Sequence, residues 1–246
     1  MKILVNGAGG RMGRVLCGMI EKGCRNAELA GMVDARAAGE GILPSLGDFT
    51  GEADCVVDFS HHTAAKELAD YAVSHRCPLV VATTGQTDGE LALLREASAS
   101  APVFLSGNMS MGIALLSELA RQTAKAFPDA DIEIVEAHHN QKLDVPSGTA
   151  LMLAKSIQSV RPDAELVVGR HENGKRKKQE IGIHSLRLGG VVGVHEILVD
   201  TGTQTITLKH EARDRALFAE GALAAAEFLI GKAPGFYDMN DLVHTI

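Results

Sequence analysis

The chain has 246 residues, of which 46% are hydrophobic and 22% are charged, a composition typical of a soluble globular protein with one large or two modest domains. Its formal net charge of −7 argues against nucleic acid as the main partner, and its apolar runs are too short to span a membrane. The first residues lead into a strand rather than a signal peptide, and the four scattered cysteines form no C-x-x-C pair, so we expect reduced thiols and a cytoplasmic location.

A glycine-rich turn follows the first predicted strand. Residues 2–6 form a short apolar run and residues 14–20 have helical spacing, so the turn joins a strand to a helix. The pattern is G-x-x-G-x-x-G, because a methionine stands where the strict G-x-G-x-x-G motif has its last glycine. Such a turn lets a pyrophosphate approach the backbone at a helix N-terminus, so it predicts a dinucleotide-binding unit. The residues of the turn that we expect to contact the cofactor are Gly7, Gly10, Arg11, Met12 and Gly13.

An acidic residue ends the second predicted strand, residues 29–33. Asp34 lies about 20 residues beyond the glycine turn, where a carboxylate accepts hydrogen bonds from the adenosine ribose. The same carboxylate repels a 2′-phosphate, whereas Arg36 is placed to pair with one. We therefore expect NADH to be used at least as well as NADPH.

Strands and helices continue to alternate after a turn-rich, irregular stretch at residues 39–51. The predicted strands are residues 54–59, 78–82 and 103–105, and the predicted helices are residues 63–74 and 88–100. Apolar strands that alternate with helices predict a parallel sheet covered on both faces, an α/β, Rossmann-like doubly wound fold. Thr83, Thr84 and Gly85 stand at the carboxyl end of one strand, where they either receive a nicotinamide ribose or carboxamide or form an ordinary polar turn.

The stretch of residues 136–150, E-A-H-H-N-Q-K-L-D-V-P-S-G-T-A, lies between a predicted strand and a predicted helix. The strand is residues 131–135 and the helix is residues 151–157, with Ser147 or Thr149 as the N-cap. The unpaired N–H groups and the dipole of a helix start favour an anion. The loop before them supplies two imidazoles and an ammonium, which suits an acidic substrate that must accept a proton. A surface loop with solvated histidines explains the same residues when they are taken alone.

The rest of the chain predicts a second, strand-rich domain. Its strands are residues 165–168, 182–188, 192–200 and 203–212, and the last three are separated by tight-turn signals. The basic block at residues 175–178 is interpreted as a solvated loop. An alanine-rich helix at residues 216–230 is expected to pack back on the first domain. We therefore expect a discontinuous dinucleotide-binding domain (residues 1–109 and 214–246) and an α+β domain with a mixed, open sheet (residues 110–213).

The stretch 136–150 matches every fixed position of E-x-H-H-x-x-K-x-D-x-P-S-G-T-A, and it closely resembles the signature of the dihydrodipicolinate reductase (4-hydroxy-tetrahydrodipicolinate reductase) family. Further segments are similar to the family's D-F-T/S, G-T-T-G, N-x-S-x-G, H-S-x-R, I-V-G-E-H and H-x-A-x-x-R-x-x-F-A motifs, so the resemblance covers nearly the whole chain. Ala82 replaces the first glycine of G-T-T-G, and Gly190 and Val194 stand where the family usually has acidic residues. In the family, an acid followed directly by arginine accompanies NADP use, whereas here Ala35 intervenes.

The resemblance implies NAD(P)H-dependent reduction of 4-hydroxy-tetrahydrodipicolinate, a small cyclic dicarboxylate, on the route to diaminopimelate and lysine. His138 is the preferred general acid because imidazole titrates near the working pH, and Lys142 either donates a proton or only holds charge. His139 is expected to bind one carboxylate and Ser147, Gly148 and Thr149 the other, while Asp144 orients the loop. Further cofactor contacts are implied at Phe59, Ser60, Ala82, Thr83, Thr84, Ser106, Asn108 and Met109. The family also implies a homotetramer formed through the second sheet.

The same residues allow three other interpretations. A related NAD(P) dehydrogenase of the aspartate pathway has no obvious use for the His-His-Lys and Ser-Gly-Thr cluster. A non-catalytic dinucleotide-sensing protein would bind NADH without consuming it. A metal enzyme using His138, His139 and Asp144 is disfavoured because adjacent histidines on a strand point to opposite faces, so no metal is expected.

Overall fold

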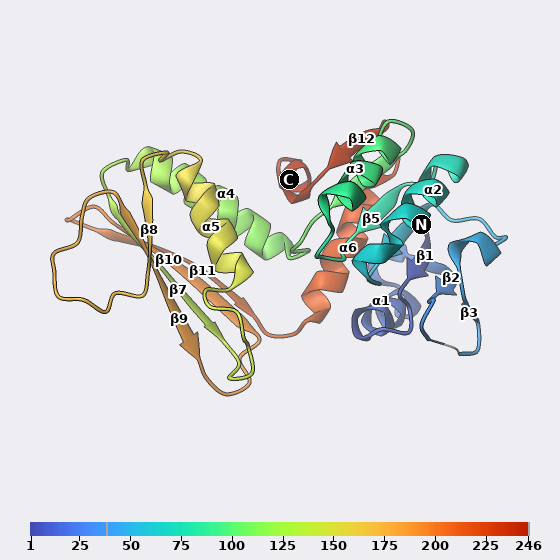
Figure 1. The fold of residues 1–246 in the computed structure, drawn as a ribbon, viewed down its shortest axis with the longest axis horizontal. Helices are drawn as coiled ribbons and strands as arrows, with labels where there is room; N and C mark the ends of the chain where they lie inside the picture. The colour runs from blue at the N-terminus through green and yellow to red at the C-terminus, as the bar shows by residue number, and fades with distance from the viewer. Residues whose placement is uncertain (38, 246) are drawn as a thin grey trace. The chain divides into compact units, whose positions relative to one another are not determined.

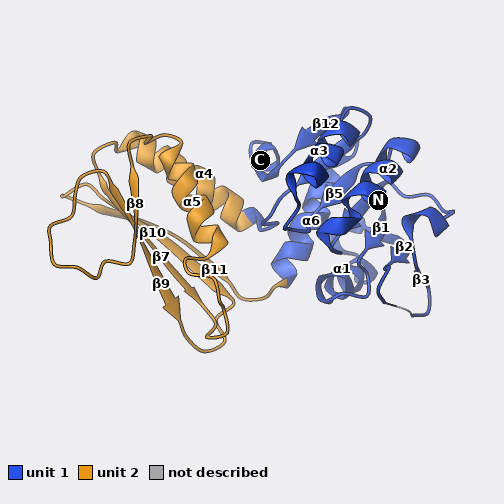
Figure 2. Cartoon of the chain, viewed as in Figure 1, with its two compact units in different colours: residues 1–111, 216–246 blue, residues 112–215 orange. Residues whose placement is uncertain are grey.

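The computed structural model describes residues 1–37 and 39–245, which form two compact units (Figures 1 and 2). Unit 1 comprises residues 1–111 and 216–246, and unit 2 comprises residues 112–215. The chain therefore changes units after residue 111, where we expected residue 109, and again after residue 215, where we expected residue 213. Within the described residues, no helix has both the length and the apolar character needed to cross a bilayer.

Unit 1 is built on a seven-stranded parallel sheet in the order β12-β6-β5-β4-β1-β2-β3. This order runs outward from β1 in both directions, which is the doubly wound arrangement that the alternation predicted. The strands are β1 (Lys2–Asn6), β2 (Glu28–Val33), β3 (Ile42–Leu43), β4 (Cys55–Asp58), β5 (Leu79–Val81), β6 (Pro102–Leu105) and β12 (Gly235–Tyr237). Strands β1, β4, β5 and β6 are almost wholly buried because helices cover both faces (Figure 1).

Helices α2 (Ala65–His75) and α3 (Asp88–Ala97) pack on one face of this sheet through Leu68, Ala72 and Leu94. Helices α1 (Arg11–Glu21) and α6 (Ala216–Leu229) pack together on the other face (Figure 1). Four fully buried alanines in α6 let this helix lie close to the strands: Ala219, Ala222, Ala225 and Ala226. The short helix α7 (Met239–Val243) follows β12.

Unit 2 contains a five-stranded mixed sheet in the order β11-β10-β7-β9-β8. The strands are β7 (Asp131–His138), β8 (Glu165–Val168), β9 (Glu180–Arg187), β10 (Gly193–Asp200) and β11 (Thr205–Ala212). Strand β10 is antiparallel to β7 and β11, whereas β9 is parallel to β7 and β8. Helices α4 (Met111–Ala126) and α5 (Gly148–Gln158) cover one face, and alternate isoleucines of the strands form the core beneath them.

The structure differs from the sequence-based expectation at several element boundaries. The helix after the glycine turn begins at Arg11, not at residue 14. The stretch 39–51 contains β3 and a turn of 3-10 helix at Leu46–Asp48. Strand β7 continues to His138, so this residue lies on a strand and not in the following loop. Strand β12 and helix α7 were not expected at all.

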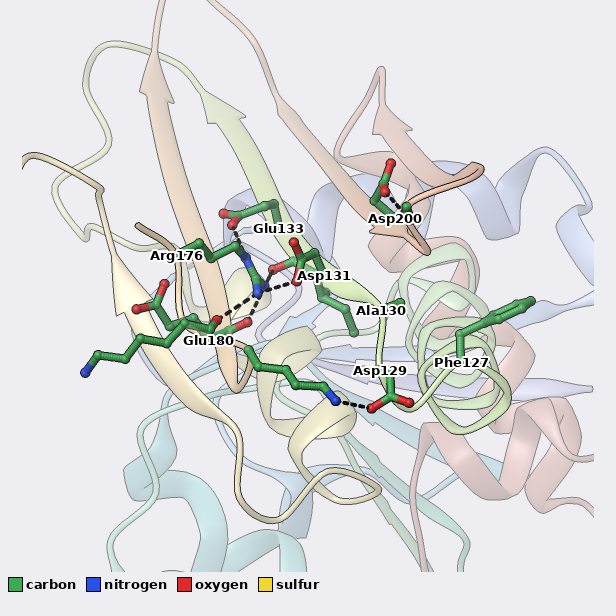
Figure 3. A network of polar contacts seen from close by, with 12 residues as sticks. Phe127, Asp129, Ala130, Asp131, Glu133, Arg176, Glu180 and Asp200 are labelled. Atoms are coloured by element: carbon green, nitrogen blue, oxygen red, sulfur yellow. Dashed lines mark hydrogen bonds and ion pairs between the residues drawn. The ribbon is translucent and has the colours of Figure 1, made fainter. Parts of the chain in front are cut away.

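Arg176, which we expected in a solvated loop, instead anchors that loop to the sheet (Figure 3). Its guanidinium donates to Asp131 at 2.6 Å, to Glu133 at 3.2 Å and to the backbone carbonyls of Ile132, Lys177 and Glu180. Glu133 also pairs with His184 at 2.7 Å. Gly182 makes room for this carboxylate, because a Cβ there would lie 1.6 Å from Glu133 Oε2. The arginine of the basic block therefore has a structural role.

Candidate active site

A pocket of about 460 Å³ lies in unit 1 at the carboxyl ends of β1, β2 and β4. This edge of a doubly wound sheet is where nucleotides bind. Most of the residues predicted there from the glycine turn, the acid and the D-F-S segment do line the pocket: Gly7, Gly10, Asp34, Phe59 and Ser60. Arg36, the residue placed to meet a 2′-phosphate, lines it as well.

The glycines of the turn are required by close backbone contacts. Gly7 has a φ of +78°, and a Cβ there would lie 2.7 Å from the backbone of Phe59 and Ser60. A Cβ at Gly13 would lie 2.1 Å from the carbonyl oxygen of Gly7, so only glycine lets α1 approach β1 this closely. Gly10 is the N-cap of α1 and makes no side-chain cap, and the first turn holds no acidic residue. The first N–H groups of α1 therefore suit a pyrophosphate.

Asp34 fixes the shape of this pocket through its carboxylate. Oδ2 accepts the N–H of Gly9 at 3.0 Å, and Oδ1 accepts the N–H groups of Arg36 at 2.8 Å and Ala37 at 3.0 Å. The residue that was predicted to bind a ribose therefore also ties the glycine turn to the turn after β2. Its remaining lone pairs are the ones available to a ribose hydroxyl.

Asp58 is a completely buried carboxylate that the sequence did not single out. It accepts hydrogen bonds from Asn6 at 2.8 Å, from Thr83 at 2.7 Å and from both the N–H and the hydroxyl of Ser60. Burial raises the pKa of this carboxyl, and the hydrogen bonds from Ser60, Thr83 and Asn6 oppose that rise. Asp58 thereby fixes two of the hydroxyl side chains that were predicted to contact the cofactor.

The remaining predicted cofactor contacts stand further along the same edge of the sheet. Ala82, Thr83 and Thr84 follow β5, and Ser106, Asn108 and Met109 follow β6. The hydroxyl of Ser106 donates to the carbonyl of Asn108 at 2.8 Å, which closes a tight turn, and the Met109 side chain is buried. These residues do not line the pocket of about 460 Å³, but Thr83 is joined through Asp58 to Asn6 and Ser60, which do line it.

In unit 2 the catalytic candidate His138 lies at the end of β7, paired with a buried carboxylate. His138 Nδ1 is 2.6 Å from Oε2 of Glu136, whose side chain is fully buried. Arg187 on β9 donates to both oxygens of this carboxylate, at 2.8 and 2.9 Å. The side chains therefore form a charged cluster at the end of the sheet.

The N-terminus of α5 is joined to this cluster. Ser147 is the N-cap: its hydroxyl oxygen accepts the N–H of Ala150 at 3.1 Å, and its own N–H donates to Glu136 at 3.2 Å. His195 on β10 lies 3.1 Å from the Ser147 hydroxyl, and its ring meets that of His138 edge to face. Ser147 is thus the N-cap, and Thr149 occupies the first turn of the helix.

The loop between β7 and α5 carries the remaining candidates. Lys142 pairs with Asp144 at 2.8 Å, which agrees with the expectation that Asp144 orients the loop. The pKa of Asp144 is lowered, chiefly by Lys142, and the N–H of Gly148 contributes to the lowering. His139 directly follows the strand and is partly buried. The lysine ammonium and the start of α5 therefore share one carboxylate of the chain itself.

Burial and neighbouring charges set the protonation of the cluster. Burial would raise the pKa of Glu136, but hydrogen bonds from Arg187 and His138 outweigh it and hold the value at about 2. Burial lowers the pKa of His138, and Glu136 opposes this effect. Burial and the nearby His138 lower the pKa of His195 to about 4. Glu136 is therefore ionised at neutral pH, and His195 is neutral.

The sequence found His138, Lys142, Ser147 and Thr149 but did not assign roles to Glu136, Arg187 or His195. Glu136 stands in the same motif, two residues before His138, and that spacing places both side chains on one face of a strand. Arg187 and His195 were seen only as parts of segments beside the site. Within the described residues, no group of three or more His, Cys, Asp or Glu side chains is arranged to hold a metal.

Comparison with known proteins gives matches over nearly the full chain. The family models described as "Dihydrodipicolinate reductase, N-terminus" and "Dihydrodipicolinate reductase, C-terminus" match residues 1–109 and 112–243. A 4-hydroxy-tetrahydrodipicolinate reductase of Caldanaerobacter subterraneus subsp. tengcongensis is 42% identical over 99% of this chain and 98% of its own length. A second one, of Brachyspira hyodysenteriae, is 39% identical over 99% of this chain and 100% of its own length. The solved structure of a dipicolinate-bound dihydrodipicolinate reductase from Paenisporosarcina sp. TG-14 is similar with a TM-score of 0.79, 25% identity and 97% coverage of each chain.

Proposed function

The chain belongs to the dihydrodipicolinate reductase family, and from this premise we propose that it reduces 4-hydroxy-tetrahydrodipicolinate to tetrahydrodipicolinate with His138 as the proton donor. The relatives are named for this reduction, and we assign it in this chain to the NAD(P)H-dependent step of diaminopimelate and lysine biosynthesis. The substrate loses its 4-hydroxyl as water, and the resulting double bond is reduced at C4. The reduction adds one hydride and one proton to the dehydrated ring, so the net change is gain of a hydride and a proton and loss of one water.

The observation that carries this proposal is the pairing of His138 with Glu136 beside the capped start of α5. When bound, the reduced nicotinamide supplies the hydride. Hydride delivery to a conjugated imine builds negative charge on the substrate, which the imidazolium of His138 neutralises by giving up its proton. Lys142 carries a positive charge close enough to this imidazole to lower the pKa of His138. It either stabilises the developing charge or donates a proton itself.

The substrate's carboxylates are assigned to two sets of groups. The N–H of Gly148 and the side chain of Thr149 lie in the first turn of α5, where the helix dipole favours an anion, and the Ser147 hydroxyl stands at its cap. His139 is proposed to hold the second carboxylate. The Asp144 carboxylate already contacts Lys142 at the same helix start, so we expect an incoming carboxylate to compete with it.

The test of this function is consumption of NADH or NADPH, followed by absorbance, when freshly generated substrate is added to the purified chain. We expect His138→Gln to lower kcat by about 10²-fold with little change in KM, because only the proton transfer is lost. An unchanged kcat would remove His138 from the mechanism. A chain that binds NADH and consumes none would instead favour the sensing protein.

We also propose that NADH is used at least as well as NADPH. Asp34 contributes a carboxylate to the pocket, which would repel a 2′-phosphate bound there, and Arg36 is the one lysine or arginine among the described residues that line it. Comparison of kcat/KM for the two cofactors tests this, and a large preference for NADPH would refute it.

A homotetramer is proposed on the basis of the second sheet. Helices α4 and α5 cover only one face of it, and the other face carries partly exposed apolar side chains such as Leu186, which is 50% exposed. Light scattering at micromolar concentration should give about four times the 26.0 kDa chain mass. A monomer under these conditions would overturn the proposal.

A further inference from the structure

We propose that Glu136 is a positioning residue that makes Nε2 the proton-exchanging nitrogen of His138 and ties this nitrogen to the anion-binding start of α5. The inference rests on the function proposed above and assigns a role that the motif alone does not reveal. The side chain of Glu136 has no exposed surface, although it is a carboxylate, and it lies two residues before the proposed acid His138. A buried charge of this kind has to be paired, and each of its partners belongs to the site.

One oxygen of Glu136 determines the tautomer of His138. Oε2 lies 2.6 Å from Nδ1, and an ionised carboxylate only accepts hydrogen bonds, so Nδ1 carries a proton in both the neutral and the charged ring. The proton that the ring gains and loses is therefore the one on Nε2. Gly193 leaves space on that side, because a Cβ at this position would lie 3.2 Å from Nε2.

The other oxygen of Glu136 reaches the anion site. Oε1 accepts the N–H of Ser147, the N-cap of α5, at 3.2 Å. Arg187 bridges both oxygens, and its Nη2 also donates to the carbonyl of Asp144 at 2.7 Å. A single carboxylate therefore sets the position of the imidazole, the helix start and the loop between them.

Charges from several elements act on the ring of His138. Glu136 raises its pKa, whereas burial lowers it most and Lys142 and Arg187 lower it further. His195 on β10 meets the ring edge to face, and His210 on β11 is the cross-strand partner of His195. Asp144 holds the charge of Lys142 at 2.8 Å. Glu136 is the carboxylate in direct contact with the ring, so its removal should have the largest effect on the imidazolium.

The first test is Glu136→Gln, assayed for kcat and KM between pH 5 and 9. The amide can keep its oxygen towards Ser147, but its NH₂ then faces Nδ1 and cannot accept the proton there. We expect kcat to fall by about 10²-fold while KM stays within about threefold. Because the acid must be protonated, activity is lost as pH rises through the pKa of His138, and in the variant this loss should occur at lower pH.

Arg187→Gln is the matched control. It removes a positive charge that lowers the pKa of His138 and leaves the carboxylate in place, so the loss of activity at alkaline pH should move to higher pH. Opposite shifts in the two variants support positioning by charge and tautomer. Two results would overturn the inference: shifts in the same direction, or the same changes in kcat and KM in Glu136→Gln and Arg187→Gln. Either would mean that Glu136 and Arg187 only support the fold.

Nitrogen-15 NMR of the His138 ring provides a readout without turnover. In the wild type, neutral His138 should carry its proton on Nδ1, with and without pyridine-2,6-dicarboxylate as the probe ligand. In Glu136→Gln it should shift to the Nε2–H form, and circular dichroism checks that the variant is folded. An unchanged tautomer in the folded variant refutes the role of Glu136. Loss of the proposed function is distinct from this: it would appear as a wild-type chain that does not consume NADH, or as full kcat in His138→Gln.

Discussion

Glu136, His138 and His195 are buried polar side chains at one end of the unit 2 sheet, and each has a cross-strand neighbour. His195 is opposite Glu136 on β7 and opposite His210 on β11. Burial removes the hydration that favours an imidazolium, so His195 stays neutral and bonds to the Ser147 hydroxyl. His195 thus occupies an interior position of the sheet, where apolar residues are usual, and orients the Ser147 hydroxyl.

At the residue scale we predict an acid-sensitive stability from His195. Its folded pKa of about 4 lies below the ordinary histidine value, so the unfolded chain binds the extra proton first as pH falls. The contribution of His195 to the free energy of unfolding is therefore fully present above its unfolded pKa of about 6.5. It is lost progressively as pH falls from about 6.5 to about 4, by roughly 3 kcal/mol at most.

His195→Gln should remove this dependence while still offering a group to Ser147. Urea unfolding of wild type and variant at pH 7.5 and pH 4.5 measures the difference. The wild type should lose more stability than the variant between these two values. Equal losses would show that His195 does not titrate in this range.

The contacts that the sequence could not reveal are those between residues distant in the chain. Glu136 and Arg187 are 51 residues apart, and Ser147 and His195 are 48 apart. The local motif revealed His138, Lys142 and the helix start, because acid, cation and N-cap chemistry can be recognised within 15 residues of sequence. Which strands pair, and in which register, is decided by the packing of the whole unit.

At the scale of elements, the same limit explains the misplaced boundaries. Strand β7 extends beyond its apolar alternation because Ala137 and His138 pair with Leu186 and Arg187 on β9. Strand β12 has only three residues, too few to show a period, and it forms by pairing with residues 102–104 of β6. The long apolar strands and the alanine-rich α6 were predictable because their own apolar residues indicate that they are buried.

Helix α1 offers a prediction with an internal control, since it contains two glycines with opposite surroundings. Gly13→Ala places a Cβ 2.1 Å from the carbonyl oxygen of Gly7, so the helix must move away from β1. We expect a loss of about 2 kcal/mol or more in stability, and weaker NADH binding because the pyrophosphate site is displaced.

Gly18→Ala is the control, because a Cβ at Gly18 has no atom within 4 Å apart from its chain neighbours and the nearby backbone of its own helix. It should leave NADH affinity unchanged and stabilise the helix by up to about 1 kcal/mol. Thermal unfolding and NADH fluorescence titration on both variants give the comparison. Similar losses in the two would show that helix propensity, and not the contact with Gly7, dominates.

At the scale of the whole molecule, the two units have separate hydrophobic cores. The core of unit 1 joins α2 and α3 to the parallel sheet, and that of unit 2 joins α4 and α5 to the mixed sheet. The pocket that we assign to the dinucleotide is lined by residues of unit 1, whereas the proposed acid and anion groups all lie in unit 2. Each ligand should therefore stabilise one unit directly.

We predict that hydrogen exchange will separate the two ligands. A ligand at about 100 times its Kd stabilises the state it binds by about 2.7 kcal/mol, which slows exchange about 100-fold for amides that open with the binding unit. NADH alone should protect peptides around residues 7–13, 34–37 and 58–60. Pyridine-2,6-dicarboxylate alone should protect residues 136–150. If the dicarboxylate alone protected the glycine turn and left residues 136–150 unchanged, the substrate groups would be assigned to the wrong unit, and the role of His138 would fall with them.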